Sequence, residues 1–334
     1  MKGGISRPGK QAARLKETGL EDEKGANSPI GANQRTGMTN NISLINPSVL
    51  ASISNLELRA RTAVEGFLNG LHKSPFRGFS VEFTEYTHYN PGDDIRHVDW
   101  KLYARSDKYY IKQYEDETNV RCHILLDSSA SMGYGSGDIT KLEFARTLAS
   151  ALAYFMIRQR DAVGMIIFDE KIREFLPSRY KQSHLIQILR ALANMELGNK
   201  TNLARPISDL AFNLNRKGLV ILISDLLDDE ETIIKGLQHI RFKGNDVIVF
   251  HVMDNAELTF PFERISQFED MESHEKLTAA PRAIRKAYLR ELEKFCSFYR
   301  QKCQVNGIDY CQLNTSEPLD TALSSYLSRR SKSF

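Results

Sequence analysis

The sequence predicts an α/β fold in which helices cover both faces of a mostly parallel β-sheet. At 334 residues, with 41% hydrophobic and 26% charged residues, the chain has the length and composition to build a large buried core. From residue 121 onward, apolar runs suited to strands alternate with amphipathic runs suited to helices. This alternation is typical of parallel strands joined by helices. Because the chain exceeds the usual length of one domain, we also expect a smaller unit beside the principal core.

The N-terminal part is expected to hold a tail and a small subdomain. Residues 1–40 are rich in Gly, Lys, Arg, Asn and Ser and poor in large apolar residues, which predicts a flexible basic tail. In the helix and β-rich subdomain expected over 41–118, Ser54 and Glu57 have the spacing of a capping box that opens a helix. Two β-favouring runs follow this helix, at residues 79–89 and 109–114.

The sheet itself is expected over residues 119–255. Strands are predicted near residues 121–126, 162–168, 219–224 and 246–252. Helices, in which Leu and Ala recur at steps of three and four, are predicted over residues 141–158, 182–195, 202–215 and 230–241. Residues 171–176 follow the second strand after a short turn, which predicts one antiparallel strand at an edge of the sheet.

Residues 256–334 are expected to complete the fold as a C-terminal extension. After Pro261 the pattern becomes irregular, and Pro281 then opens a long helix that reaches about Gln304. Proline suits this position because the first turn of a helix leaves its amides unused. Gly307 is expected to end the helix. A strand over 308–313 and a helix over 318–327 are predicted to follow.

Composition argues against several classes of partner. The net charge of +3 comes from interspersed acidic and basic residues, so the chain lacks the basic stripe that nucleic-acid binding needs. No apolar run approaches the length that crosses a bilayer, and the opening residues lead into no signal sequence. The four cysteines show no metal-binding pair, which predicts reduced, packed thiols. We therefore expect a cytoplasmic protein with no nucleic-acid partner and no membrane span.

A carboxylate and two hydroxyls follow the first predicted strand of the sheet. Asp127, Ser129 and Ser131 come directly after the apolar run 122–126 and alternate along one tight turn, so that their side chains can face one point. Together they offer the hard oxygen ligands that Mg²⁺ prefers. The first hypothesis is therefore a divalent-cation site. The alternative is a polar loop whose serines cap the following turn.

Two later segments add oxygens at the same edge of the predicted sheet. Thr201 lies just before a predicted helix, and Asp225 ends the strand at 219–224. Ligands of open α/β sheets bind outside the carboxyl ends of the strands, which is where these residues belong. In this hypothesis the serine hydroxyls coordinate directly, the two carboxylates hold metal-bound waters, and Thr201 coordinates directly or through water. One position of the octahedron stays open for a carboxylate of another protein.

These residues resemble the metal-ion-dependent adhesion site of von Willebrand factor A-type domains. The pattern of that family is Asp-x-Ser-x-Ser, then a Thr, then an Asp, and all five positions are matched. The matching residues are Asp127, Ser129, Ser131, Thr201 and Asp225. The resemblance covers about residues 119–255. It implies a Rossmann-like, doubly wound fold and partner binding that depends on Mg²⁺, with Mn²⁺ as the alternative cation.

A second resemblance lies upstream, in Pro91-Gly92-Asp93-Asp94-Ile95-Arg96-His97-Val98-Asp99-Trp100. This string resembles the bacterial family catalogued as domain of unknown function 58, whose members join such a segment to an A-type domain. Members commonly accompany MoxR-type AAA+ ATPases, so the resemblance implies an adaptor or chaperone role beside such an ATPase. Read physically, the dense set of acids and bases around Trp100 is expected to fix how a subdomain docks rather than to catalyse a reaction.

Three functions remain open from the sequence. The leading one is a non-enzymatic, Mg²⁺-dependent protein-interaction module. The second is a Mg²⁺-dependent phosphohydrolase of haloacid-dehalogenase type, which would use Asp127 as nucleophile. Such enzymes carry a second Asp two residues further on, where this chain has Ser129. The third is a scaffold that has lost its metal and binds through the N-terminal tail.

Overall fold

The structure is a computed structural model that describes residues 15–18, 54–73, 86–88, 110–112, 120–198, 203–213, 217–271 and 275–324. The chain divides into two compact units, residues 1–67 with 121–334, and residues 68–120. In the smaller unit, β2 (Tyr86–His88) and β3 (Tyr110–Lys112) form an antiparallel pair. Each of these strands lies within one of the two β-favouring runs predicted from the sequence.

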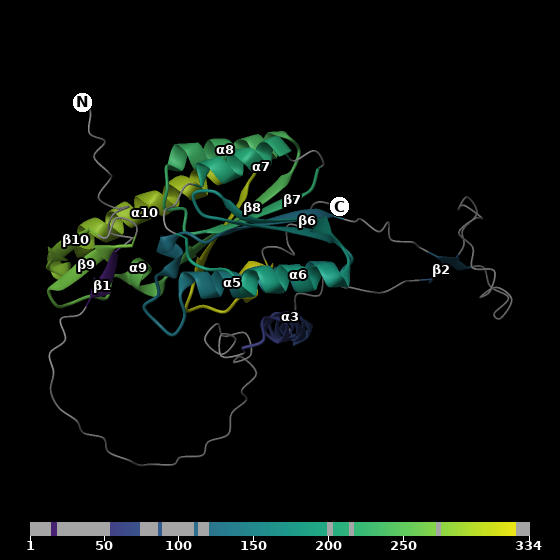
Figure 1. The fold of residues 1–334 in the computed structure, drawn as a ribbon, viewed down its shortest axis with the longest axis horizontal. Coiled ribbons are helices and arrows are strands. Elements are labelled where there is room, and N and C mark those ends of the chain that lie inside the picture. The colour runs from purple at the N-terminus through teal and green to yellow at the C-terminus, as the bar shows by residue number, and fades with distance from the viewer. Residues whose placement is uncertain are drawn as a thin grey trace, which may run out of the picture. The chain divides into compact units, whose positions relative to one another are not determined.

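A six-stranded sheet forms the centre of the larger unit (Figure 1). Its strands are β4 (Arg121–Asp127), β5 (Ala162–Phe168), β6 (Ile172–Arg179), β7 (Leu219–Ser224), β8 (Asp246–Met253) and β11 (Asp309–Asn314). They lie in the order β11-β8-β7-β4-β5-β6. Every neighbouring pair is parallel except β5 and β6, which are antiparallel. The predicted fold class and the predicted antiparallel edge strand are both confirmed.

Helices cover both faces of this sheet (Figure 1). One face carries α5 (Lys141–Arg158) and α6 (Gln182–Ala193), and the other carries α7 (Ala204–Asn213), α8 (Glu230–Phe242) and α10 (Pro281–Val305). Strands β5 and β7 are buried at every position because they are covered on both sides. Their apolar runs, AVGMIIF and LVILIS, are therefore core rather than alternating surface sequence.

The helix boundaries follow from local capping. Thr140 accepts a hydrogen bond from the backbone N–H of Glu143 and so opens α5. Pro281 occupies the first turn of α10, and Gly307, with a φ of 64°, follows the end of that helix, both as predicted. Helix α3 (Leu56–Lys73) begins where the sequence predicts, but its capping residue was predicted wrongly. Asn55, not Ser54, accepts the free amides of its first turn.

A second sheet lies beyond the short helix α9 (Asn255–Thr259). In it β9 (Ser266–Asp270) pairs on one side with β10 (Lys276–Ala279) and on the other with β1 (Leu15–Thr18). None of these three strands was predicted, and β1 lies within residues 1–40, which were expected to form a flexible tail. Their runs of four and five residues are too short for a clear alternation, and packing of Phe268 against other aromatic rings holds β9 to the core.

Candidate functional site

The carboxyl ends of β4 and β7 form the topological switch point of the central sheet. From β4 the chain continues to β5 and β6 on one side, and it later returns through β7 to β8 and β11 on the other. Ligands of open α/β sheets bind in the crevice at such a point. Asp127 is the last residue of β4, and Asp225 directly follows the last residue of β7. The two predicted acidic ligands therefore lie at the ends of neighbouring strands.

Asp127 is fully buried and accepts hydrogen bonds at both carboxylate oxygens. Its Oδ1 accepts from the backbone N–H of Ser129 at 2.9 Å, and its Oδ2 accepts from the hydroxyl of Ser224 at 2.6 Å. Burial and the negative charge of Asp225 raise the pKa of Asp127 to about 7. Two buried carboxylates that repel each other are a setting in which a cation is stabilising. Ser224 was not predicted as a site residue, although the Ser-Asp pair that ends its strand is visible in the sequence.

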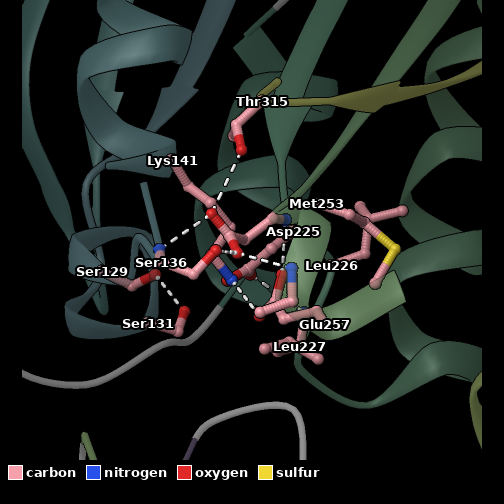
Figure 2. Close-up of polar contacts among 12 residues, drawn as sticks. Ser129, Ser131, Ser136, Lys141, Asp225, Leu226, Leu227, Met253, Glu257 and Thr315 are labelled. Carbon is pink, nitrogen blue, oxygen red and sulfur yellow. Dashed lines mark hydrogen bonds and ion pairs between the residues drawn. The ribbon is translucent and has the colours of Figure 1, made fainter. Parts of the chain in front are cut away.

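The two serines connect the loops after β4 and β7. The Oγ atoms of Ser129 and Ser131 lie 3.1 Å apart, and hydrogen bonding from Ser131 helps to hold the pKa of the Asp225 carboxyl below its ordinary value. Ser131 lies in η3 (Ala130–Gly133), a short 3₁₀ helix that directly follows Ser129. Figure 2 shows both serines at the left of the close-up and Asp225 near its centre. The structure therefore brings four of the five predicted ligands into one hydrogen-bonded cluster.

The oxygens of this cluster have the chemistry and spacing of a magnesium site. Two neighbouring ligands of an octahedral Mg²⁺, each at 2.0–2.1 Å, lie about 3.0 Å apart. The Ser129 and Ser131 oxygens, at 3.1 Å, match that separation. No group of three or more His, Cys, Asp or Glu side chains suited to a metal occurs among the described residues. The cluster thus fits a hydroxyl-based site rather than one built mainly of acids.

Thr201, the fifth predicted ligand, lies outside the described residues. The chain on either side of it is anchored to the two loops of the cluster. Before it, the backbone N–H of Gly198 donates to the carbonyl of Ser128 at 2.6 Å. After it, the backbone N–H of Leu203 donates to Asp228 Oδ2 at 2.8 Å. Both ends of the segment that carries Thr201 are therefore attached at the switch point.

A buried lysine, which sequence reasoning missed, lies against Asp225. Lys141 is the first residue of α5, and its ammonium donates to Asp225 Oδ2 at 2.8 Å and to Glu257 Oε1 at 2.7 Å. Its side chain is fully buried. Figure 2 shows Lys141 reaching between these two acids. The three residues are far apart in the chain, so only the fold reveals that they meet.

The charges of this ion-pair cluster shift each other's pKa values. Burial acts to raise the pKa of Asp225, but the charge and hydrogen bond of Lys141 outweigh it, and that pKa lies below the ordinary value. Burial also raises the pKa of Glu257, to about 7, and there it outweighs the stabilising charge of Lys141. Burial disfavours the charged form of Lys141, yet the two acids raise its pKa above the ordinary value. The two acids therefore favour the ammonium form of Lys141 within the cluster.

The backbone beside Asp225 is supported by the C-terminal extension. Leu226 adopts the left-handed conformation, with a φ of 57°, which is unusual for a residue with a branched side chain. Its carbonyl accepts a hydrogen bond from the Tyr299 hydroxyl at 3.2 Å, and its amide donates to the Ser224 hydroxyl at 2.9 Å. The ring of His251 donates from Nε2 to the Asp225 carbonyl at 3.0 Å. Burial lowers the pKa of His251 to about 4, so this ring is neutral at neutral pH.

Glu257 is itself fixed by a second polar group. Its Oε2 accepts from the backbone N–H of Asp254 at 2.8 Å, within a capping box at the start of α9. Asp254 in turn accepts from the Thr315 hydroxyl at 3.2 Å and from the backbone N–H of Ser136 at 3.1 Å. Figure 2 shows Thr315 above and Ser136 to the left, and both donate to the same oxygen, Oδ2 of Asp254. The loop after η3 is thereby tied to the C-terminal extension.

The upstream string Pro91–Trp100 lies outside the described residues. All four cysteines lie within the described part of the chain and are free thiols. Three of them are buried and Cys311 is partly buried, as the sequence predicts. Within that part of the chain, no helix combines the length and the apolar character needed to span a membrane.

Fold and cluster together define a doubly wound α/β protein with a polar, oxygen-rich site at its switch point. The chain belongs to the family described as protein of unknown function DUF58, whose model matches residues 85–295. This match confirms the resemblance of the upstream string, which lies within the matched range.

Curated relatives include uncharacterised proteins of Mycobacterium tuberculosis (strain ATCC 25618 / H37Rv) and Mycobacterium bovis (strain ATCC BAA-935 / AF2122/97). Each is 26% identical over 230 residues, which cover 68% of this chain and 72% of the relative.

Solved structures of similar fold include two proteins of low sequence identity. The conserved hypothetical protein BatB from Bacteroides thetaiotaomicron is 19% identical, with a TM-score of 0.45, and the match covers 64% of this chain and 99% of BatB. The VWA domain of SpRpn10 is 11% identical, with a TM-score of 0.39, and the match covers 62% of this chain and 94% of that domain. At these identities the likeness is one of fold alone.

Proposed function

We propose that this chain is a non-enzymatic, Mg²⁺-dependent protein-interaction module that binds a carboxylate of its partner at the switch point. The observation that carries the proposal is the pair of hydroxyls, Ser129 and Ser131, held 3.1 Å apart between two buried carboxylates. Bound there, Mg²⁺ would supply an electrophilic centre with one open position for an acid. Mn²⁺, which prefers similar oxygen ligands, is the alternative cation.

The hydroxyl ligands explain why an external acid would be recruited. Ser129 and Ser131 contribute no charge, and the oxygens of Asp127 already accept two hydrogen bonds within the protein. Asp225 is likewise engaged by Lys141. A cation held in this way keeps much of its positive charge, and a carboxylate from outside is its natural last ligand. We propose Thr201 as the remaining ligand from this chain.

A MoxR-type AAA+ ATPase is the partner that we propose for this module, in the cytoplasm, with the chain acting as its adaptor. This part of the proposal depends on membership of the DUF58 family. The partner would bind by coordinating the metal with its carboxylate. Such binding needs no catalytic residue in this chain.

The phosphohydrolase alternative finds less support at the site. Its mechanism needs a second acid close to Asp127 to donate and accept protons. The position two residues on is Ser129, whose hydroxyl faces Ser131. Glu257, an acid of the neighbouring cluster, has both oxygens engaged, one by Lys141 and the other by the Asp254 amide.

Calorimetric titration of the full chain with Mg²⁺ tests the proposal, with Asp127→Asn as the variant and Ser150→Ala as its control. Asp127→Asn removes one buried charge, whereas Ser150 donates to the Thr147 carbonyl within α5 and serves no ligand role. We expect saturable Mg²⁺ binding in the wild type and the control and none in Asp127→Asn. Capture of a MoxR-type ATPase should require the cation and Asp127. Absence of Mg²⁺ and Mn²⁺ binding at millimolar concentrations would overturn the proposal, and phosphatase turnover lost in Asp127→Asn would favour the alternative.

A further inference from the structure

Lys141 is a buried cation directly beside a site proposed to bind another cation. Its side chain has no solvent exposure, and an ammonium in such a place is costly unless acids surround it. Asp225 and Glu257 provide those acids, at 2.8 and 2.7 Å. The lysine lies at the start of α5, a helix whose N-terminus is already the positive end of its dipole. The position thus concentrates positive charge next to the cluster.

This lysine limits what Asp225 can offer to a metal. Oδ2 of Asp225 accepts from Lys141, while Oδ1 accepts a long hydrogen bond, 3.3 Å, from the Leu227 amide. One oxygen of the carboxylate is therefore committed to an internal partner. A divalent cation among the serine hydroxyls would also be repelled by this buried ammonium, because little water screens charges in a buried site. Both effects weaken cation binding compared with a cluster that lacks the lysine.

We propose that Lys141 is a positioning residue that weakens the binding of a lone cation at the candidate metal centre, so that the partner's acid strengthens it. It holds Asp225 in place when no cation is present, and it opposes a cation that arrives alone. A carboxylate from the partner adds the negative charge that offsets this repulsion, so cation and acid favour each other's binding. The inference rests on the proposed function, since it concerns the regulation of that same site.

Three variants separate this role from a purely structural one. At full ionisation, Lys141, Asp225 and Glu257 carry a net charge of −1. Lys141→Met leaves the two acids alone, Glu257→Gln leaves the lysine with one acid, and the double variant Lys141→Met/Glu257→Gln has the charge of the wild type without the ammonium. Lys141→Met leaves two buried acids without their cation, which can prevent folding. The double variant leaves only Asp225 in that state, so it can be tested even if Lys141→Met does not fold. Lys294→Met, which removes an exposed ammonium paired with Glu291, is the matched control.

The experiment is calorimetric titration of each full-length variant with Mg²⁺ alone, accompanied by thermal melts in EDTA and in Mg²⁺. We expect Lys141→Met and the double variant to bind Mg²⁺ about tenfold more tightly than the wild type or better, because an opposing charge has been removed. Glu257→Gln should bind more weakly, and Lys294→Met should match the wild type. Mg²⁺ should raise the melting temperature of Lys141→Met more than that of the wild type.

The outcomes separate this inference from the proposed function. If Lys141 were purely structural, its replacement would weaken Mg²⁺ binding. Weaker binding, or unchanged affinity in both lysine variants, would overturn the inference. Either result would leave the proposed function intact. Mg²⁺ binding in the double variant but not in the wild type would support the inference and would contradict the Mg²⁺ binding by the isolated wild type that the proposed function expects. Absence of binding in every variant would overturn both.

Discussion

The backbone N–H of Gly198 donates to the carbonyl of Ser128 at 2.6 Å, which joins the segment before Thr201 to the loop after Asp127. Gly198 can approach so closely because it has no side chain. A Cβ at this position would lie 2.2 Å from Oδ2 and 2.7 Å from Cβ of Asp169, the residue that follows β5. The contact thus depends on glycine, for reasons of space rather than of backbone angle.

Gly198→Ala should therefore displace this segment from the Ser128 carbonyl. We expect a loss of about 1–3 kcal/mol in the free energy of unfolding, as for other overpacked positions, together with weaker Mg²⁺ binding. Urea denaturation and calorimetry measure the two effects. Gly137→Ala is the control, because a Cβ there meets nothing within 4 Å. Equal behaviour of the two variants would contradict the steric argument.

Removal of either serine hydroxyl should weaken Mg²⁺ binding. Ser129→Ala and Ser131→Ala each delete one of the two oxygens that lie 3.1 Å apart. Loss of an outer partner of a metal site already costs about 10–100-fold in affinity, so we expect at least that loss for a direct ligand. Calorimetry with Mg²⁺ checks the prediction, and Ser150→Ala, which removes another buried hydroxyl, should retain full affinity. Unchanged binding in both site variants would show that the cation does not lie between these oxygens.

Asp169 should make stability depend on pH in the acid range. Burial acts to raise the pKa of its carboxyl, but the hydrogen bonds from Arg173 and from the Lys171 amide outweigh this and hold the pKa below the ordinary value. A lowered pKa means that the stabilisation is complete above the unfolded pKa, about 3.9 for Asp, and is lost as the pH falls through the folded value.

Asp169→Asn tests this assignment in urea denaturation at several pH values. The difference in free energy of unfolding between wild type and variant should be constant from pH 6 to 7 and should shrink as the pH falls below about 4. A difference that does not change with pH would show that Asp169 contributes through packing rather than charge.

Helix α3 should depend on one buried arginine for its attachment to α5. Arg59, 6% exposed, forms an ion pair with Glu143 and donates to the Thr147 hydroxyl at 3.3 Å. Arg59→Met should cost about 1.5–3 kcal/mol, the usual contribution of a hydrogen bond to a charged group. Hydrogen exchange of α3 amides and urea denaturation measure the loss. Arg61→Met is the control, since Arg61 pairs with Glu65 at the surface and should matter little. Similar losses in both variants would contradict this account.

The sequence predicts the central sheet well because its signals are local. Each buried strand is one apolar run, and some helix starts have a recognisable residue, such as Pro281 at α10. The positions of Asp127 and Asp225 follow from the same rule, since parallel strands bring their carboxyl ends to one edge. What remains a prediction is the metal itself, together with the role of Thr201.

The contacts around Lys141 could not be predicted, because they join residues 84 and 116 positions apart. A lysine at the start of a helix is usually a surface residue, and nothing in its neighbours distinguishes it from one. Glu257 likewise has the sequence pattern of an ordinary capping box. Their meeting depends on how the fold brings the start of α9 to the start of α5, which tertiary packing alone determines.

The strained backbone at Leu226 has a consequence for how this protein can be divided. Its carbonyl is held by Tyr299, a residue of α10 that lies well past the range resembling an A-type domain. A fragment trimmed to residues 119–255 would keep Asp127 and Asp225 but would discard Tyr299, Glu257 and Thr315. Such a fragment would retain these two acids without the residues that hold them in place. The smallest fragment with an intact site must therefore include α10 and the residues after it as far as Thr315.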